Sequence, residues 1–481
     1  MESVKQGLAY IDYAERFSAQ EIADAIRNLK TNKAAGADKL NSEHFIYCSK
    51  RLYPILCMIY NCSLIHGYLP ARLMESIIVP IAKDNKEPLT NKDNYRPIAL
   101  TCVGSKLLET VMLERYRNCL LSTEAQFGYK PKHSTDMCVF ALKETVQFYI
   151  SLGSPVYLCF MDASKAFDKV NHWHLYDKLL KRNVPLFIVR LLCFWFSSQE
   201  FMVKWDNMFS TSFKVCNGVR QGGILSPVLF NVYIDDLSVR LNSSNIGCHF
   251  YSTCVNHFFY ADDAVLLAPS PYALKCLIDI CVQFASENEM MYNTTKTKCM
   301  FIRGKHCNDI QPVRQYLYGC KLRWVDTICY LGCFITNDMK DERDIKRQTR
   351  SIYGRGNVTV RKFSNCSAEV KNQLFRSYIS CLYSSHLWCS YGTKQYSAVR
   401  VAYNNVYRNL MGIIPGSSIT SAYVRNYVSD FNVTRRKFIN NFRSILMKSC
   451  NKIVSSFISS VYFMYSSKLN CKWYKATYVI G

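Results

Sequence analysis

Two adjacent carboxylates stand at residues 262 and 263 of the 481-residue chain, between stretches rich in aromatic and aliphatic side chains. The first stretch ends in Phe258-Phe259-Tyr260, and residues 264–268 form the second. Ionised carboxylates are costly to bury without a cation, so this pattern predicts a β-hairpin with Asp262 and Asp263 at its turn. A divalent cation at that turn would offset the repulsion between the two acids.

A third acid follows another apolar stretch about a hundred residues upstream, where residues 156–161 end at Asp162. Two neighbouring strands, one ending at Asp162 and the other turning at Asp262, would bring their carboxylates together around two hard cations. The sequence therefore predicts a site for two Mg²⁺ ions, with Mn²⁺ as an alternative ion.

A glycine-rich stretch at residues 218–227 lies between these acidic motifs and contains Gln221, Gly222 and Pro227. Apolar residues at helical spacing follow Pro227, which predicts a helix there. Glycine allows the backbone to approach a bound ligand closely. We therefore expect this stretch to form part of a binding pocket.

The motifs occur in a specific order along the chain. They are Asp162 with Phe167, Gln221-Gly222, Tyr260-Ala261-Asp262-Asp263, Lys296-Thr297 and Tyr330-Leu331-Gly332. This ordered set resembles the reverse transcriptase domain of non-LTR (LINE-type) retrotransposons, and residues 33–38, 94–98 and 126–130 resemble the fingers motifs of that family. The resemblance covers roughly residues 20–340. It implies an RNA-directed DNA polymerase that extends a DNA 3′-OH primer on an RNA template.

The resemblance implies an α+β fold with right-hand polymerase architecture, which comprises fingers, a palm with an antiparallel sheet, and a helical thumb. We expect an N-terminal segment and fingers in residues 1–151, a palm with the catalytic site in 152–337, and a basic helical thumb with a C-terminal extension in 338–481. Local patterns add helix starts at Ser18, which forms a capping box with Glu21, and near Ser134.

Roles for the catalytic and metal-binding residues also follow from the resemblance. Asp162 and Asp262 would each contact both Mg²⁺ ions, and Asp263 would support them. Ala163 would offer its backbone carbonyl to the ion on the triphosphate side. Lys296 would act as a proton donor near the leaving pyrophosphate.

Further residues are expected to bind the incoming deoxynucleoside triphosphate. They are Arg96, Lys130, Ala163, Phe167, Gln221, Gly222 and Tyr260. Phe167 is predicted to exclude a ribose 2′-hydroxyl, and Arg96 and Lys130 to contact the triphosphate. Lys130 departs from the family, which more often has arginine there, and lysine lacks the bidentate fork of arginine.

Three other acidic residues are predicted to lie outside the metal site. Tyr233-Ile234-Asp235-Asp236 repeats the spelling of the hairpin motif, but it lies near the end of the helix predicted after Pro227. We expect its two acids to face solvent. Asp168, next to Phe167, is expected to make a structural hydrogen bond and not to bind metal.

The composition suits binding to a polyanion. The formal net charge is +24, and residues 341–481 carry 22 basic and 5 acidic residues, an excess of 17. Aromatic residues are interleaved with these cations, as in the segment from Tyr403 to Arg408. Phosphate contact with base stacking is therefore predicted, and the expected partners are an RNA template and a DNA primer or target DNA.

Cysteine spacing and hydropathy argue against zinc-binding, secreted and membrane proteins. None of the 23 cysteines forms a Cys-x-x-Cys pair, which argues against zinc knuckles. The sequence shows no signal peptide and no apolar run of transmembrane length. We therefore expect an intracellular protein with no membrane partner, and the resemblance alone implies the nucleus as its site of action.

Two rival readings stay open. One is a noncatalytic relic that folds and binds RNA without polymerising, although intact Asp162, Asp262, Asp263 and Gln221 argue against it. The other is a group II intron maturase or an RNA-templated RNA polymerase, of which Phe167 argues only against the second. No segment resembles the endonuclease of complete elements. The chain is therefore expected to be one domain of a longer polyprotein, with an endonuclease domain of the same element among its partners.

Overall fold

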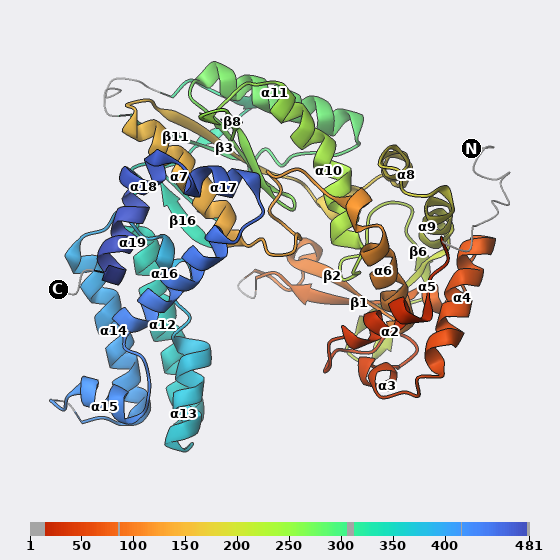
Figure 1. Ribbon diagram of the computed structural model, residues 1–481, viewed down its shortest axis with the longest axis horizontal. Coiled ribbons are helices and arrows are strands. Elements are labelled where there is room, and N and C mark those ends of the chain that lie inside the picture. The colour runs from red at the N-terminus through yellow and green to blue at the C-terminus, as the bar shows by residue number, and fades with distance from the viewer. Residues whose placement is uncertain (1–14, 85–86, 305–311, 415, 479–481) are drawn as a thin grey trace. The chain divides into compact units, whose positions relative to one another are not determined.

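The computed structural model describes residues 15–84, 87–304, 312–414 and 416–478 (Figure 1). The chain divides into two compact units. Unit 1 comprises the described residues of Met1–Lys130, Ala163–Arg240 and Ile280–Tyr292, and unit 2 comprises those of Pro131–Asp162, Leu241–Asp279 and Asn293–Gly481. Helices α10 (Ser226–Ser243) and α11 (Pro271–Glu287) contribute residues to both units.

Unit 1 is built on a sheet in the order β2-β1-β4-β5, with β6 also paired to β4. Strand β1 (Glu75–Ala82) runs antiparallel to β2 (Tyr95–Thr101) and parallel to β4 (Glu200–Trp205). Short strands β5 (Met208–Phe209) and β6 (Phe213–Lys214) complete it. Seven described helices belong wholly to this unit: α2 (Ala19–Arg27), α3 (Ser42–Ile46), α4 (Leu52–His66), α5 (Ala71–Met74), α6 (Val103–Arg115), α8 (His172–Lys181) and α9 (Leu186–Ser198).

Helix α2 shows how local sequence sets an element of unit 1. Ser18 and Glu21 form the predicted capping box, in which each side chain bonds to the backbone N–H of the other residue. Ile22 and Ile26 lie one turn apart on the buried side of the helix. Glu21 also forms an ion pair with Arg115 of α6 at 2.6 Å, which links the two helices.

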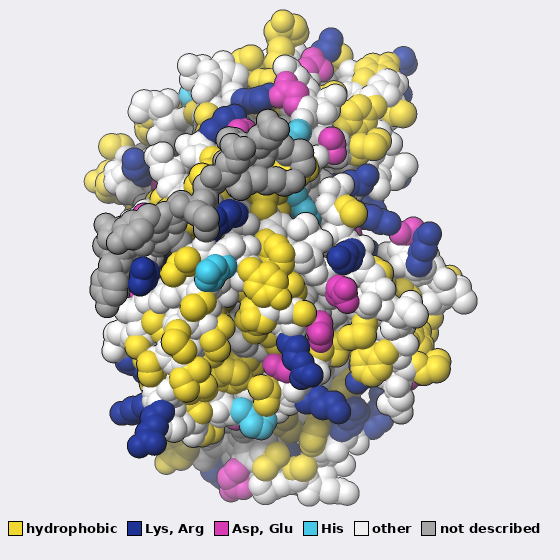
Figure 2. Space-filling view, turned by 90° about the vertical axis from the view of Figure 1, so that its right-hand side faces the viewer, with side chains coloured by type: hydrophobic (Ala, Val, Ile, Leu, Met, Phe, Trp, Pro, Cys, Tyr) yellow, Lys and Arg dark blue, Asp and Glu magenta, His cyan; other side chains and the backbone are white. Residues whose placement is uncertain are grey.

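Helix α4 carries apolar side chains on its solvent-facing side as well as on its buried side. Ile55, Met58 and Ile59 are between 37% and 60% exposed, whereas Tyr60 and Leu64 are buried. Figure 2 shows that hydrophobic side chains gather on the face of the molecule that includes α4.

Unit 2 contains a second sheet, in the order β14-β11-β3-β10-β9. The strands are β3 (Val156–Asp162), β9 (His257–Tyr260), β10 (Asp263–Ala268), β11 (Lys298–Ile302) and β14 (Arg323–Trp324). All pairs are antiparallel except β11 with β14. Residues 156–161 of the central strand β3 are buried, and α7 (Thr135–Ser151) packs against β3 and β9. Strand β3 ends at Asp162, as predicted.

Three small hairpins and a group of helices make up the rest of unit 2. The hairpin strands are β7 (His249–Phe250), β8 (Thr253–Cys254), β12 (Tyr316–Leu317), β13 (Cys320–Lys321), β15 (Thr327–Tyr330) and β16 (Cys333–Thr336). The later helices are α12 (Glu342–Phe363), α13 (Ala368–Leu374), α14 (Thr393–Met411), α15 (Ile419–Arg425), α16 (Phe431–Met447), α17 (Lys452–Ile458), α18 (Val461–Tyr465) and α19 (Lys468–Tyr478). The predicted α+β class is therefore confirmed, and residues 342–478 are largely helical as predicted.

A buried ion pair fixes the start of α12 against α7. The ammonium of Lys143 contacts Asp341 at 2.6 Å, and both side chains are less than 7% exposed. The second oxygen of Asp341 accepts the backbone N–H groups of Cys389 and Ser390, each at 2.7 Å. Burial alone would lower the pKa of Lys143, but Asp341 offsets this and holds the pKa above its usual value.

Among the described residues, no helix is long and apolar enough to cross a membrane. The cysteines in the same part of the chain are all free thiols.

Replacing Lys143 by Met is expected to destabilise unit 2, because Asp341 would keep a buried charge without its cation. Removing one partner of a buried pair costs about 3–5 kcal/mol, and urea unfolding followed by circular dichroism would measure it. The matched control is Lys181→Met, which removes an exposed pair with Asp177 within α8. Equal unfolding midpoints for the two variants would contradict the role given to Lys143.

Candidate active site

The predicted hairpin is present and its turn is short. Tyr260 in β9 lies opposite Asp263 in β10, so Ala261 and Asp262 form a two-residue turn. Ala261 has φ of 57°, which is an uncommon conformation for a residue with a Cβ atom. Such backbone strain persists only where the surrounding structure holds the turn in place, and it is frequent at functional sites.

Three aspartates meet at one end of the unit 2 sheet. The register of β3 with β10 pairs Asp162 directly with Asp263, and Asp262 precedes Asp263 in the turn. Loss of hydration, together with the negative charges of Asp262 and Asp162, raises the pKa of Asp263 to about 6. The residue still reaches the surface, so the shift reflects crowding of like charges as well as partial burial.

The donor set fits a divalent cation that is shared with substrate. Within the described ranges, no group of three His, Cys, Asp or Glu side chains is arranged to hold a metal by itself. Mg²⁺ is usually bound in proteins by one or two carboxylates together with waters and substrate phosphates. Asp162 and Asp262 can supply the two carboxylates.

A turn that contains Lys296 is attached to the backbone of Asp162. The N–H of Asn293 donates to the Asp162 carbonyl at 2.8 Å, and the N–H of Asp162 donates to the hydroxyl of Thr297 at 3.2 Å. Within the turn, the side-chain oxygen of Asn293 accepts the N–H of Lys296 at 3.0 Å. The backbone of the exposed Lys296 is therefore fixed relative to Asp162.

Sequence reasoning missed the part played by Asn293 and Thr297 in this turn. The side chain of an Asn often accepts the backbone N–H two residues further on and so forms a turn. Asn293 accepts the N–H of Thr295 in this way at 3.0 Å, and this tendency of Asn could have revealed the turn. Thr297 is fully buried, which a polar residue tolerates only when it is hydrogen-bonded.

The other predicted substrate-binding residues lie in unit 1. Phe167 stacks on Phe230 with ring centroids 4.5 Å apart and planes 13° apart, and it makes an edge-to-face contact with Tyr129, whose ring centroid is 6.1 Å from that of Phe167. Gln221 donates from its side-chain amide to the Asp168 carboxylate at 3.2 Å. The structural hydrogen bond predicted for Asp168 is therefore confirmed, while the roles of Phe167 and Gln221 stay predictions.

The two cations expected at the triphosphate differ in their surroundings. Arg96 in β2 is exposed. The ammonium of Lys130 donates to the backbone carbonyls of Ser122 at 3.1 Å and Thr123 at 2.9 Å. A role for Lys130 at the triphosphate would require its side chain to leave these two carbonyls. Ala163 forms an isolated bridge with Tyr292, which holds its backbone in place.

One expectation for the second Tyr-x-Asp-Asp motif is wrong. Asp235 does not face solvent, because it is 5% exposed and forms an ion pair with Arg182 at 2.6 Å. It also accepts the N–H of Thr123 at 2.7 Å, and Asp236 pairs with Lys178. Lys178 belongs to α8 and Arg182 is the C-terminal cap of that helix. The apolar pattern of α10 alone could therefore not reveal these two partners. The motif serves packing within unit 1.

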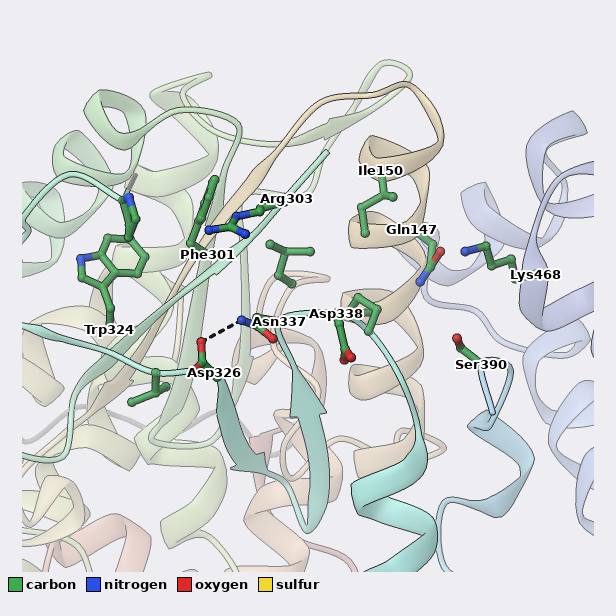
Figure 3. A pocket seen from close by; sticks show the side chains of 14 residues that line it. Gln147, Ile150, Phe301, Arg303, Trp324, Asp326, Asn337, Asp338, Ser390 and Lys468 are labelled. Carbon is green, nitrogen blue, oxygen red and sulfur yellow. Dashed lines mark hydrogen bonds between the residues drawn. The ribbon is translucent and has the colours of Figure 1, made fainter. Parts of the chain in front are cut away.

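Unit 2 also contains a cavity (Figure 3), and its lining residues do not include Asp162, Asp262 or Asp263. It measures about 750 Å³, and its lining includes Phe301, Trp324, Arg303 and the hydrogen-bonded pair Asp326 and Asn337. Phe301 and Ile302 pair with the first two residues of β3, whereas Asp162 is the last. The first and last residues of β3 are six residue steps apart, which is roughly 20 Å at about 3.3 Å per residue. The cavity is therefore not the site of the paired acids.

The comparison with protein families decides the identity of the chain. The model of the family described as reverse transcriptase (RNA-dependent DNA polymerase) matches residues 81–335, which is more than half of the sequence. The chain belongs to the reverse transcriptase family. The matched range contains the glycine-rich stretch, the Asp162 strand and the Asp262 hairpin.

Individual relatives come from mobile elements. The RNA-directed DNA polymerase from mobile element jockey of Drosophila funebris is 30% identical over 273 residues, which cover 55% of this chain and 28% of that protein. The Pol polyprotein from type-2 retrotransposable element R2DM of Drosophila melanogaster is 28% identical over 297 residues, covering 59% and 27%. The resemblance to reverse transcriptases of non-LTR elements is therefore confirmed. The matched parts span less than a third of these curated relatives.

Among solved structures, apo telomerase from Candida tropicalis aligns with a TM-score of 0.43 and 11% identity, covering 94% of this reverse transcriptase and 77% of that chain. Telomerase from the same organism in complex with a fragment of telomeric RNA aligns with a TM-score of 0.41, covering 89% and 68%.

Asp263→Asn is expected to stabilise the metal-free protein at neutral pH. The carboxyl of Asp263 has a pKa of about 6 in the fold against a usual value of 3.8, so its ionisation opposes folding as the pH rises through that window. The asparagine variant should melt at a higher temperature than native protein at about pH 7.5 in chelator, and this difference should vanish near about pH 4. Asp279→Asn, at an exposed position of α11, is the control. A pH-independent difference would contradict the crowding of the three acids.

Proposed function

We propose that the chain is the polymerase part of a non-LTR retrotransposon protein and extends a DNA 3′-OH primer on an RNA template. The observation that carries this proposal is the convergence of Asp162, Asp262 and Asp263 at one end of the unit 2 sheet, inside the range matched by the family model. Neighbouring carboxylates that share no cation repel one another and destabilise the fold. A divalent metal ion that takes part in the reaction would explain why three of them lie together.

In this proposal Asp162 and Asp262 hold two Mg²⁺ ions, which when bound activate the primer hydroxyl and neutralise charge on the triphosphate. Asp263 would support these two ligands with its carboxylate. Ala163 offers its backbone carbonyl on the triphosphate side. Lys296, fixed next to Asp162 by the Asn293 turn, donates a proton to the leaving pyrophosphate.

The remaining residues bind the incoming deoxynucleotide. Arg96 and Lys130 would contact the triphosphate, Gln221 and Gly222 would form the floor of the pocket, and Tyr260 would be a further contact to the nucleotide. Phe167 excludes the ribose 2′-hydroxyl. Its ring cannot yield easily, because it is stacked on Phe230, which is fully buried.

The division into fingers (1–151), palm (152–337) and basic thumb (338–481) is part of the proposal. So are the partners: an RNA template, a DNA primer or target DNA, and an endonuclease domain of the same element. The proposal places the reaction in the nucleus, where target DNA is found. The excess of cations in residues 341–481 supports nucleic-acid binding by the thumb.

The test is extension of a labelled DNA primer on an RNA template with deoxynucleotides and Mg²⁺. Native protein is expected to extend the primer, and Asp262→Ala to lose extension by a factor of about 10³ or more. The control is Asp279→Ala, at an exposed position of α11, which should keep near-native activity. Absence of extension by folded native protein that still binds the RNA–DNA duplex would favour the noncatalytic relic.

Phe167→Ala is expected to admit ribonucleotides. Removing the ring opens space for a 2′-hydroxyl, so the ratio of kcat/KM for a deoxynucleotide to that for the matching ribonucleotide should fall by roughly tenfold or more. Single-nucleotide extension with each substrate measures the ratio, which corrects for any general loss of active protein. Phe230→Leu would show how far the stacked partner alone affects it. An unchanged ratio in Phe167→Ala would mean that the ring is a core residue only.

A further inference from the structure

A buried carboxylate of α6 holds the loop that contains Gln221 and Gly222. We name residues 220–225 the Gln221 loop. One oxygen of Glu109 contacts the guanidinium of Arg220 at the start of this loop, and the other accepts the N–H groups of Ile224 at 2.5 Å and Leu225 at 3.1 Å at its end. Glu109 is 1% exposed and Arg220 is 6% exposed. A single carboxylate therefore ties both ends of the loop together.

The end of the loop is also the start of α10. The first N–H groups of a helix have no partner within the helix, and its dipole favours a negative charge at this end. Glu109 supplies that charge from a helix more than a hundred residues earlier in the sequence. The position of α10 and the shape of the Gln221 loop are therefore fixed by the same side chain.

The opposite side of the Gln221 loop is held by β2 and by Asp168. The N–H of Ala99 donates to the carbonyl of Gln221 at 2.6 Å, and the side chain of Gln221 donates to Asp168 at 3.2 Å. Gly222 has φ of 122°, and a Cβ atom there would come within 2.6 Å of the Ala99 carbonyl oxygen. Only glycine fits this position. The Gln221 loop, with Ala99 on one side and Glu109 on the other, therefore has little conformational freedom.

The ion pair is a poor choice for stability alone. The Arg220 guanidinium lies over the ring of Trp195 at 4.7 Å, and its Nε and Nη1 atoms are buried without a hydrogen-bond partner. The desolvation penalty of burying two charges offsets much of the electrostatic attraction between them. A well-packed apolar pair at the same place often stabilises a protein equally well. What an apolar pair cannot do is accept the N–H groups of Ile224 and Leu225.

We propose that Glu109 and Arg220 are positioning residues that hold Gln221 and Gly222 in the conformation that receives the incoming deoxynucleotide. This inference rests on the proposed function. Glu109→Met, which has no acceptor for these N–H groups, should raise KM for the deoxynucleotide by about 10- to 100-fold, with a much smaller change in kcat and in primer–template affinity, because only the pocket floor is displaced.

Steady-state extension at varied deoxynucleotide would compare native protein with Glu109→Met, Arg220→Met and the double variant. The control is Glu114→Met, which removes an exposed ion pair with Arg117 from the end of the same helix. The double variant leaves no unpaired charge, so its melting temperature should recover towards that of native protein while KM stays high. Recovery of KM together with the melting temperature, or equal KM values for Glu109→Met and Glu114→Met, would overturn the proposal.

Hydrogen exchange of the protein without nucleic acid tests the loop independently of activity. Glu109→Met should speed amide exchange in residues 220–226 relative to native protein and to Glu114→Met, with little change in the sheet of unit 2. Unchanged exchange in this loop would overturn the proposal even if the native enzyme were active. Faster exchange in a chain that extends no primer would instead place the failure with the proposed function.

Discussion

Repulsion among three aspartates at one end of a sheet is the constraint on which the site depends. Antiparallel pairing of β3 with β10 sets Asp162 opposite Asp263, and the two-residue turn adds Asp262. The apolar strand residues before Asp162 are buried, so the register cannot slip without moving them to the other face. The packing of the sheet thus holds like charges together, and in the proposed function a cation shared with substrate would relieve their repulsion.

Buried carboxylates recur at the beginnings of helices in both units. Glu109 accepts backbone N–H groups at the start of α10, and Asp341 precedes α12 while paired with Lys143. Asp344, in the first turn of α12, accepts from the indole of Trp388 at 2.8 Å and from Arg347 at 2.8 Å. Each of these acids satisfies donors from segments far apart in sequence. The starts of α10 and α12 are therefore fixed in position by contacts with distant parts of the chain.

Local patterns were sufficient for much of the fold and of the candidate site. The strand that ends at Asp162, the hairpin at Asp262 and the helix after Pro227 follow from short runs of residue types, and all three are present. Pairings between distant residues could not be predicted in this way. Glu109 with Arg220 and Lys143 with Asp341 are 111 and 198 residues apart. Asp235 was misjudged for the same reason, because its partner Arg182 belongs to another helix.

Crystals of the protein with an RNA–DNA primer–template, a deoxynucleotide and Mn²⁺ would test the central claim most directly, through the anomalous scattering of the ions. The account predicts Mn²⁺ peaks in contact with the carboxylates of Asp162 and Asp262, and their loss in Asp262→Asn. Mn²⁺ bound elsewhere, with these carboxylates left without an ion while the nucleotide is bound, would contradict it.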